Sequence, residues 1–269
     1  MLKPMVRASL KWSMIEEDLS VQDKFRLIAD LGFDGVELDA PNDLSLDEIT
    51  TARDTTGLAI PGVVNSQHWK TPLTHPDPAV REACIQATIV ALEQAKAYGA
   101  KTVLLVPGVV NEFTSYTAAY DRRIEGLDRL LPHAEALDIS IALENVWNDF
   151  LLSPLEAARL VDGFNSKHLG WYFDVGNVMR YGRPTDWIEA LGPRILRVDV
   201  KEFSLTRMNA EGPRKGFEVP LGEGEIDWAS VNRALSQNGY AGWASVEVPG
   251  GNRQHLAEIK RRFDHVRSL

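Results

Sequence analysis

The chain has 269 residues, of which 44% are hydrophobic and 25% are charged, as in a globular protein with one large core. Its net charge of −9 at pH 7 disfavours nucleic acid as a partner, because the phosphate backbone would be repelled. No apolar stretch is long enough to cross a bilayer, and residues 1–12 lack the apolar core of a signal peptide. We therefore expect no membrane partner and a cytoplasmic location. The single cysteine, Cys84, cannot form an internal disulfide, which agrees with a reducing compartment and a packing role.

Strand and helix patterns alternate along the first half of the chain. Short apolar strands are expected at residues 6–10, 35–38, 58–64 and 103–106. Helical patterns follow them at residues 20–31, 45–56, 78–98 and 115–137. Ser20 and Ser45 stand where N-caps belong, and Gly32 is expected to end the first helix. Pro61 and Gly62 are expected to bend the third strand.

The alternation continues to the end of the chain. Strands are expected at residues 140–144, 170–174, 195–200 and 244–248, and helices at 155–164, 226–237 and 254–267. Asp227 stands at the start of the second of these helices. Alternating β and α units without a hairpin signal predict an α/β fold, a (β/α)8 TIM barrel that forms a single domain over residues 1–269. A doubly wound open sheet is the alternative, disfavoured because no Gly-x-Gly-x-x-Gly follows the first strand.

Acidic residues recur where apolar strands end. Glu144, Asp174 and Glu247 each close such a strand, and Asp199 lies near the end of another. The carboxyl ends of barrel strands share one face, so these carboxylates are expected to converge. Four like charges raise one another's pKa values unless a cation neutralises them, which predicts a bound divalent metal ion. A lone strand-end acid more often caps a loop or helix, but the recurrence favours the metal.

Several short motifs are spread along almost the whole chain. They are residues 32–38 (GFDGVEL), 142–145 (ALEN), 173–177 (FDVGN), 200–202 (VKE), 221–228 (LGEGEIDW) and 239–243 (GYAGW) leading to Glu247. In this order and spacing they resemble the sugar phosphate isomerase/epimerase family, which has a xylose isomerase-like TIM barrel. That family includes ketose 3-epimerases, L-xylulose 5-phosphate 3-epimerases and hydroxypyruvate isomerases.

The resemblance implies a metal site and its ligands. By match of motifs, the ligands would be Glu144, Asp174, Asp199 and Glu247. Asp199 departs from the family, which usually has His there, and this leaves open whether Asp199 ligates. An all-oxygen site would prefer Mn²⁺ or Mg²⁺ over Zn²⁺. Asn177 also stands where the family often has His; it can bind a substrate hydroxyl but cannot transfer protons near neutral pH.

Other residues are candidates for binding substrate, each with a plainer alternative. His68 and Trp69 lie in the loop after the third strand, where the indole could stack on a sugar or simply pack. Lys201 could offset carboxylate charge at the site or be a solvated lysine. Arg207 could clamp a substrate or contact only water. The turn at residues 249–251 could present amides to a phosphate or be an ordinary turn, so whether the sugar is phosphorylated stays open.

The leading hypothesis is a sugar isomerase or epimerase, an isomerase that acts on a small carbohydrate through an enediolate. Glu144 and Glu247 would be catalytic, one removing a proton next to the carbonyl and the other returning one. The same deprotonation could expel a leaving group, so a lyase that works by β-elimination is an alternative. A catalytically silent sugar-binding barrel is another, and a DNA-repair endonuclease is disfavoured by the acidic charge. The resemblance also suggests a homodimer.

Overall fold

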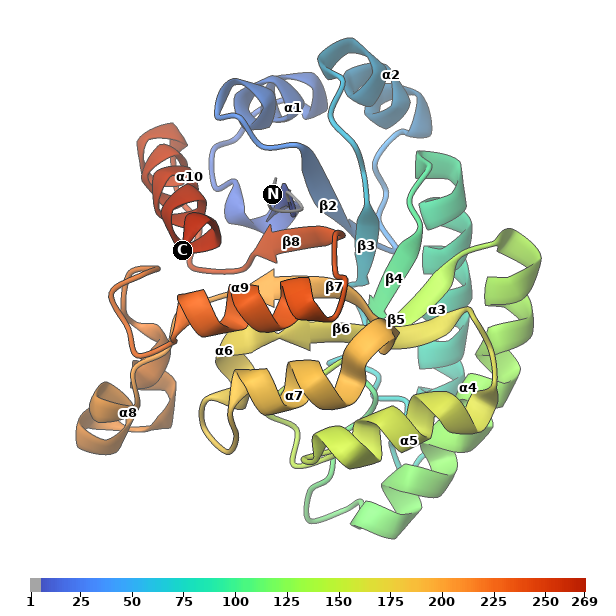
Figure 1. Cartoon of the computed structure of the whole chain (residues 1–269). Helices are drawn as coiled ribbons and strands as arrows, with labels where there is room; N and C mark the ends of the chain where they lie inside the picture. Colours follow the sequence, from blue (N-terminus) through green and yellow to red (C-terminus); the bar gives the residue numbers. More distant parts are fainter. Residues whose placement is uncertain (1–5) are drawn as a thin grey trace.

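The computed structural model describes residues 6–269, which form a closed barrel of parallel strands (Figure 1). The eight strands of this region are β1 (Arg7–Lys11), β2 (Gly35–Ala40), β3 (Gly62–Asn65), β4 (Thr102–Leu105), β5 (Ser140–Glu144), β6 (Leu169–Asp174), β7 (Ile195–Val200) and β8 (Trp243–Val246). Each strand pairs with the next, and β8 pairs with β1, where Ala8 lies opposite Ala244. The predicted (β/α)8 barrel is therefore confirmed, and an open doubly wound sheet is excluded because no strand of this barrel is an edge.

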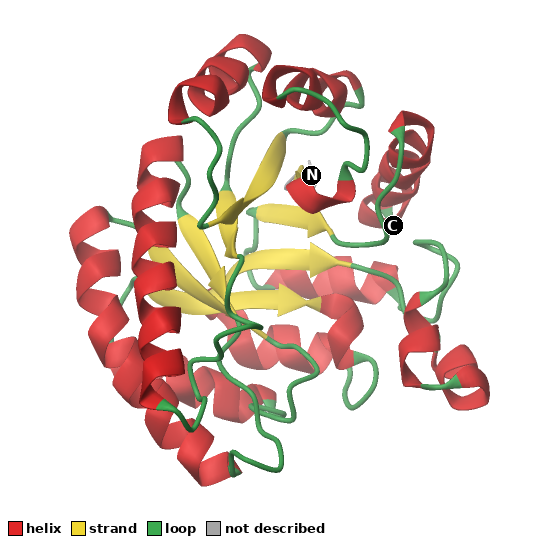
Figure 2. Ribbon diagram, turned by 180° about the vertical axis from the view of Figure 1, so that it is seen from behind, coloured by secondary structure: helices red, strands yellow, loops and turns green. Residues whose placement is uncertain are grey.

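Helices surround the barrel as an outer layer (Figure 2). The longer ones are α1 (Val21–Asp30), α2 (Leu46–Thr56), α3 (Pro78–Tyr98), α4 (Tyr116–Leu137), α5 (Pro154–Phe164), α7 (Pro184–Leu191), α9 (Trp228–Gln237) and α10 (Arg253–Ser268). Two short helices, α6 (Val175–Val178) and α8 (Leu205–Glu211), follow β6 and β7, and 3₁₀ turns occupy Trp12–Met14, Gly192–Arg194 and Pro213–Phe217. The segment that carries α8 stands out from the barrel in Figure 1.

Local signals define where several helices begin and end. The side chains of Ser20, Ser45 and Asp227 each accept a hydrogen bond from the backbone N–H three residues further on. Each cap satisfies a donor that has no partner inside the helix. Gly32 follows α1 with a φ of 82°, a conformation that a residue with a Cβ rarely adopts. These caps and this helix end are as predicted.

Helices α6, α7 and α8 and the start of β3 differ from the prediction. Helix α7 was not predicted, because its eight residues cover only about two turns, a window too short for the helical period to stand out. Its apolar face, which includes Trp187 and Ile188, is nevertheless buried. Strand β3 begins at Gly62 rather than at residue 58, since Pro61 has no N–H to donate to a neighbouring strand. Ala59 forms only an isolated bridge with Gly35.

The inside of the barrel contains a polar layer below the carboxyl ends of its strands. Arg197 Nη2 lies 2.6 Å from Glu37 Oε1, with both side chains almost completely buried. The Tyr172 hydroxyl donates to Glu37 Oε2 at 2.7 Å, and Ser245 Oγ lies 3.0 Å from both Tyr172 and Arg197. The carboxylate of Glu37 therefore braces the interior, and the charges of this layer are paired within it.

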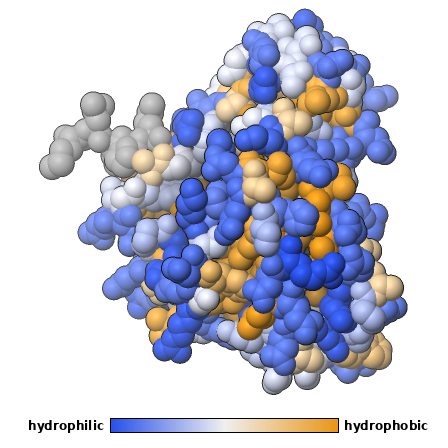
Figure 3. Space-filling view, turned by 90° about the vertical axis from the view of Figure 1, so that its right-hand side faces the viewer, coloured by the Kyte–Doolittle hydropathy of each residue, from blue (hydrophilic) through white to orange (hydrophobic). Residues whose placement is uncertain are grey.

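The outer surface is mostly hydrophilic where it is seen in Figure 3, with a narrow hydrophobic band across one face. Large apolar side chains that remain exposed include Leu46 on α2 and Val90 on α3. Cys84 is buried on α3, as expected of a packing residue. Among residues 6–269, no helix is long and apolar enough to cross a membrane. The homodimer suggested by the resemblance stays a prediction.

Breaking the buried Arg197–Glu37 pair should strongly destabilise the barrel. We expect Arg197→Met to lower the free energy of unfolding by about 3–5 kcal/mol, because the Glu37 carboxylate would stay buried without its partner. Urea unfolding followed by circular dichroism measures the change. Lys101→Met is the control: it breaks the exposed Lys101–Asp138 pair and should cost less than about 1 kcal/mol. Equal losses for the two variants would contradict this view of the interior.

Candidate metal centre

Four carboxylates come together at the mouth of the barrel. Glu144 ends β5, Asp174 ends β6, Asp199 lies in β7 directly opposite Asp174, and Glu247 follows β8. One potential ligand atom from each of the four lies within 4.8 Å of the others. The predicted convergence of strand-end acids is therefore present in the fold. These four residues could hold a metal ion.

Asn145 positions the two carboxylates that end neighbouring strands. Its Nδ2 donates to the Asp174 carbonyl at 2.7 Å, and its Oδ1 accepts from the Asp174 N–H at 3.0 Å. Trp171 Nε1 also donates to Asn145 Oδ1, so the amide is held from both sides. Asp174 Oδ1 in turn accepts from the N–H of Asn177 at the start of α6. This network holds the ends of β5 and β6 together.

The four acids differ in their access to solvent. Glu144 and Glu247 line a pocket of about 500 Å³, whereas Asp174 and Asp199 are completely buried beneath it. The other residues of the pocket wall are of mixed character and include Trp69, Trp147, Asn177, Lys201, Arg214, Phe217 and the aliphatic Val146 and Val248. A molecule in this pocket would therefore meet two of the four converging carboxylates, and the buried Glu202 also lies in the pocket wall.

Two lysines neutralise part of this charge. Lys201 Nζ lies 2.8 Å from Asp174 Oδ2 and 2.9 Å from Glu247 Oε2. Lys11, at the end of β1, lies 2.9 Å from Asp199 Oδ2 and 3.3 Å from Glu37 Oε2. Sequence reasoning considered Lys201 in this role but missed Lys11. The available signal was a lysine at the end of an apolar strand, the same place that the acids occupy.

The charges do not balance. Counting the interior layer, five carboxyl groups lie together with three basic groups, namely Glu37, Glu144, Asp174, Asp199 and Glu247 with Lys11, Arg197 and Lys201. If all are ionised, an excess of two negative charges remains. This excess equals the charge of one divalent cation.

The pKa values of the acids reflect this excess of negative charge and their burial. Burial and the charge of Glu247 raise the pKa of Glu144 well above its ordinary range. Burial likewise raises the pKa of Asp199, although Lys11 opposes the shift. Burial acts in the same direction on Glu247, but Lys201 and Lys11 outweigh it and lower the pKa of Glu247 to about 2. Without a further cation, the site is therefore driven to take up protons.

The donor set fits a hard divalent cation. All four side chains offer carboxylate oxygens, which such cations prefer. Asp199 Oδ1 is buried and has no hydrogen-bond partner among the described residues. An unpaired buried carboxylate oxygen is unfavourable, and a cation among the four groups would satisfy it. Whether Asp199 ligates stays a prediction that this geometry allows.

Three of the five residues predicted to bind substrate line the pocket, and two do not. Trp69, Asn177 and Lys201 line the pocket with the glutamates, and Asn177 Nδ2 lies 3.5 Å from Glu144 Oε1. His68 is buried behind the pocket, where its Nδ1 accepts a hydrogen bond from the backbone N–H of Val106. Arg207 lies on α8, outside the residues that line the pocket, and is paired with carboxylates of its own segment.

Sequence reasoning missed Trp147, which lines the pocket three residues after β5. Its Nε1 donates to the Asn177 carbonyl at 2.9 Å, and the guanidinium of Arg180 lies 4.8 Å from its ring centroid. The ring also packs against Phe217, whose ring centroid is 4.9 Å away. An aromatic residue so soon after a strand-end acid was the signal that could have found it.

A buried carboxylate anchors the long loop after β7. Glu202 accepts hydrogen bonds from the N–H of Gly222 at 2.8 Å and from Trp228 Nε1 at 2.9 Å. A Cβ at Gly224 would lie 2.4 Å from Glu202 Oε1, so only glycine fits there. The LGEGEIDW motif (residues 221–228) therefore surrounds and binds the side chain of Glu202. The loop that supplies Phe217 and Arg214 to the pocket is thus fixed at its base.

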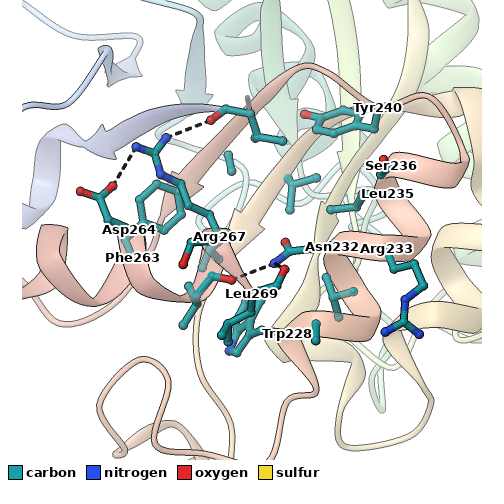
Figure 4. Close-up of a pocket in the computed structure, with 18 of the residues that line it drawn as sticks. Trp228, Asn232, Arg233, Leu235, Ser236, Tyr240, Phe263, Asp264, Arg267 and Leu269 are labelled. Atoms are coloured by element: carbon teal, nitrogen blue, oxygen red, sulfur yellow. Dashed lines mark hydrogen bonds and ion pairs between the residues drawn. The ribbon is translucent and has the colours of Figure 1, made fainter. Parts of the chain in front are cut away.

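A larger cavity of about 740 Å³ lies between α9, α10 and the outer side of the barrel (Figure 4). Its walls include Trp228, Tyr240 and Phe263. Arg267 in this cavity is already bound, since it donates to the Val6 carbonyl and pairs with Asp264. The smaller pocket, which holds the converging acids, is therefore the candidate functional site.

Comparison with known proteins agrees with this fold. The family described as xylose isomerase-like TIM barrel matches residues 25–269. The putative L-ribulose-5-phosphate 3-epimerase SgbU of Escherichia coli K12 is 26% identical over 246 residues, which cover 87% of this chain and 85% of SgbU. L-ribulose-5-phosphate 3-epimerase UlaE of Salmonella paratyphi A is 24% identical, with 91% and 88% covered. The crystal structure of 3-keto-D-glucoside 4-epimerase YcjR from E. coli has the same fold, with a TM-score of 0.82 at 15% identity over 98% of this chain and 100% of YcjR.

Replacing His68 should reduce the dependence of stability on pH. Burial lowers the pKa of His68 to about 4, whereas the imidazole of an unfolded chain titrates near 6.5. The unfolded state therefore binds more protons between these values, and stability falls as the pH decreases through this window. At pH 4.5 this loss is about 2–3 kcal/mol, and His68→Gln should abolish it.

Urea unfolding at pH 7.5 and pH 4.5 measures the effect. The control is His133→Gln, which makes the same substitution at an exposed histidine on α4. If His68→Gln loses as much stability on acidification as the parent, His68 is not held neutral.

Proposed function

We propose, on the premise that the chain belongs to the xylose isomerase-like TIM barrel family, that it is a divalent-metal-dependent epimerase of a small ketose, free or phosphorylated. This membership confirms the family predicted from the motifs. The observation that carries the proposal is the convergence of four carboxylates, two of which face a pocket. Relatives named as L-ribulose-5-phosphate 3-epimerases support epimerisation over the other reactions of this fold.

Glu144 and Glu247 are proposed to handle protons. A bound cation would act as a Lewis acid toward the ketose carbonyl and its neighbouring hydroxyl. One glutamate would remove the proton from the carbon that bears this hydroxyl. The C–H electron pair would then form the C=C bond of an enediolate. The other glutamate delivers a proton to the opposite face of that carbon. The stereochemistry at one carbon is inverted, and no net redox change or leaving group is involved.

The remaining residues have supporting roles in this proposal. Asp174 and Asp199 would hold the cation without transferring protons, because both lie beneath the pocket. Trp69 and Trp147 offer apolar ring surfaces to the C–H face of a sugar. Asn177 would orient Glu144, from which it is 3.5 Å away, and bind a hydroxyl. An all-oxygen donor set favours Mn²⁺ or Mg²⁺ as the cation.

The turn after β8 offers little support for a phosphate. The Gly251 N–H is used by the Met14 carbonyl. At the start of α10, the Arg253 N–H donates to the carboxylate of Glu17, so a negative charge of the protein already occupies this helix end. A phosphorylated substrate would instead have to place its phosphate near Arg214, an exposed basic residue of the pocket wall that is paired with no carboxylate among residues 6–269.

Removing a buried ligand should abolish stabilisation by the metal. At a Mn²⁺ concentration about 100 times the dissociation constant, the folded state of the parent should gain about 2.7 kcal/mol over the metal-free protein. Asp174→Asn should lose most of this gain, because the amide keeps the shape but not the charge. Thermal unfolding in the presence of EDTA or of MnCl₂ measures the stabilisation by the metal. The control is Asp138→Asn, which changes an exposed acid. If Mn²⁺ stabilised Asp174→Asn as much as the parent, the metal would bind elsewhere.

Exchange of carbon-bound hydrogen tests the reaction. The Mn²⁺-loaded protein is incubated in D₂O with a panel of ketoses and ketose 5-phosphates, and NMR follows loss of the C–H signal. Glu144→Gln and Glu247→Gln should each lower the rate by about 10²–10⁴-fold. Glu82→Gln, which removes an exposed carboxylate on α3, should react like the parent.

The outcomes separate the hypotheses. Exchange with formation of an epimer supports the proposal. An unsaturated product or a released group would favour the β-elimination alternative. Binding of a sugar without exchange would favour a silent barrel, and exchange that survives both glutamine substitutions would show that other groups move the proton.

A further inference from the structure

Lys201 lies where the carboxylates of the candidate centre meet. Its Nζ bridges Asp174 and Glu247, at 2.8 Å and 2.9 Å, and its side chain is only 16% exposed. Water therefore screens the contact with the fully buried Asp174 weakly, whereas Glu247 is 42% exposed on the pocket side. The ammonium group approaches two of the four donors that a divalent cation would use.

The fold makes room for this lysine. A Cβ at Gly176 would lie 2.4 Å from Lys201 Cγ, so glycine at the start of α6 lets the lysine stem pass into the site. The same side chain lines the pocket, and its Nζ lies 5.7 Å from the ring centroid of Phe217. The ammonium thus has a second environment available on the pocket side, next to an aromatic ring.

We infer that Lys201 is an internal competitor of the divalent cation, an inference that rests on the proposed function. Without the cation, Lys201 neutralises Asp174 and Glu247. On cation binding its Nζ has to leave these oxygens, because two cations at contact distance repel each other strongly in a buried site. The flexible stem then turns the ammonium toward Phe217 and the pocket, where it can donate to a substrate oxygen. Metal occupancy and the availability of Lys201 to substrate are thereby coupled.

Lys11 has a different role in this arrangement. It holds Asp199 Oδ2 and Glu37 from the interior side, and its Nζ lies 4.7 Å from the ring centroid of Tyr172. Asp199 Oδ1 is left without a hydrogen-bond partner among the described residues. Lys11 can therefore keep its contacts while the other oxygen of Asp199 faces the cation.

Isothermal titration of metal-free protein with MnCl₂ tests the inference. Lys201→Met and Lys201→Gln remove the competing charge, so both should bind Mn²⁺ at least tenfold more tightly than the parent. Lys201→Arg keeps the charge and should bind within about threefold of the parent. Lys101→Met removes a lysine from an exposed pair with Asp138 and should leave the affinity unchanged. Circular dichroism confirms that each variant is folded, and no sugar turnover enters the readout.

The result distinguishes this inference from the proposed function. Tighter binding by Lys201→Met and Lys201→Gln, with the affinity unchanged in Lys201→Arg and Lys101→Met, supports competition by Lys201. Parent protein that binds Mn²⁺ while the neutral variants bind it equally or more weakly overturns the competition and leaves the metal site intact. Absence of Mn²⁺ binding in the parent and in all variants overturns both the metal-dependent function and the role of Lys201.

Discussion

Repulsion among carboxylates at one end of a closed barrel is the constraint on which this site depends. Parallel strands deliver Glu144, Asp174, Asp199 and Glu247 to the same few ångströms because each stands at the same end of its strand. Two lysines neutralise part of the charge, and the remainder must be met by protons or by a cation. The arrangement is therefore one in which the binding of a cation, the protonation of Glu144 and the position of Lys201 are linked by the same electrostatic balance.

The polar layer inside the barrel supports this arrangement from below. Glu37 forms an ion pair with Arg197, accepts a hydrogen bond from Tyr172, and shares Lys11 with Asp199. Lys11 therefore joins the structural layer to the candidate centre through direct contacts. Because these groups are buried and mutually paired, their side chains have few alternative positions. The carboxylates above them are held on a rigid base, as a site that must position reacting atoms requires.

The mouth of the pocket is built from loops that follow different strands. Trp69 comes from the loop after β3, Trp147 from the loop after β5, and Phe217 from the segment that Glu202 anchors after β7. Proteins of this fold act on different sugars, as the names of its relatives and structural neighbours show. In this chain the barrel strands supply the carboxylates, whereas the loops supply the walls of the pocket above them.

Local patterns in the sequence were sufficient for the barrel, most of its helices and the four converging acids. Apolar periodicity, the caps at Ser20 and Ser45, and an acid at the end of a strand are all encoded within a few neighbouring residues. The contacts of Lys11 were not readable in this way, since its partner Asp199 lies 188 residues away. The burial of His68 and the ion pairs that hold Arg207 outside the pocket likewise emerged only from the fold. The sequence by itself thus determined which chemical groups stand at the strand ends. Only the tertiary structure decided which of them touch, because side chains meet across a barrel according to its closure and the stagger of its strands, which no local pattern specifies.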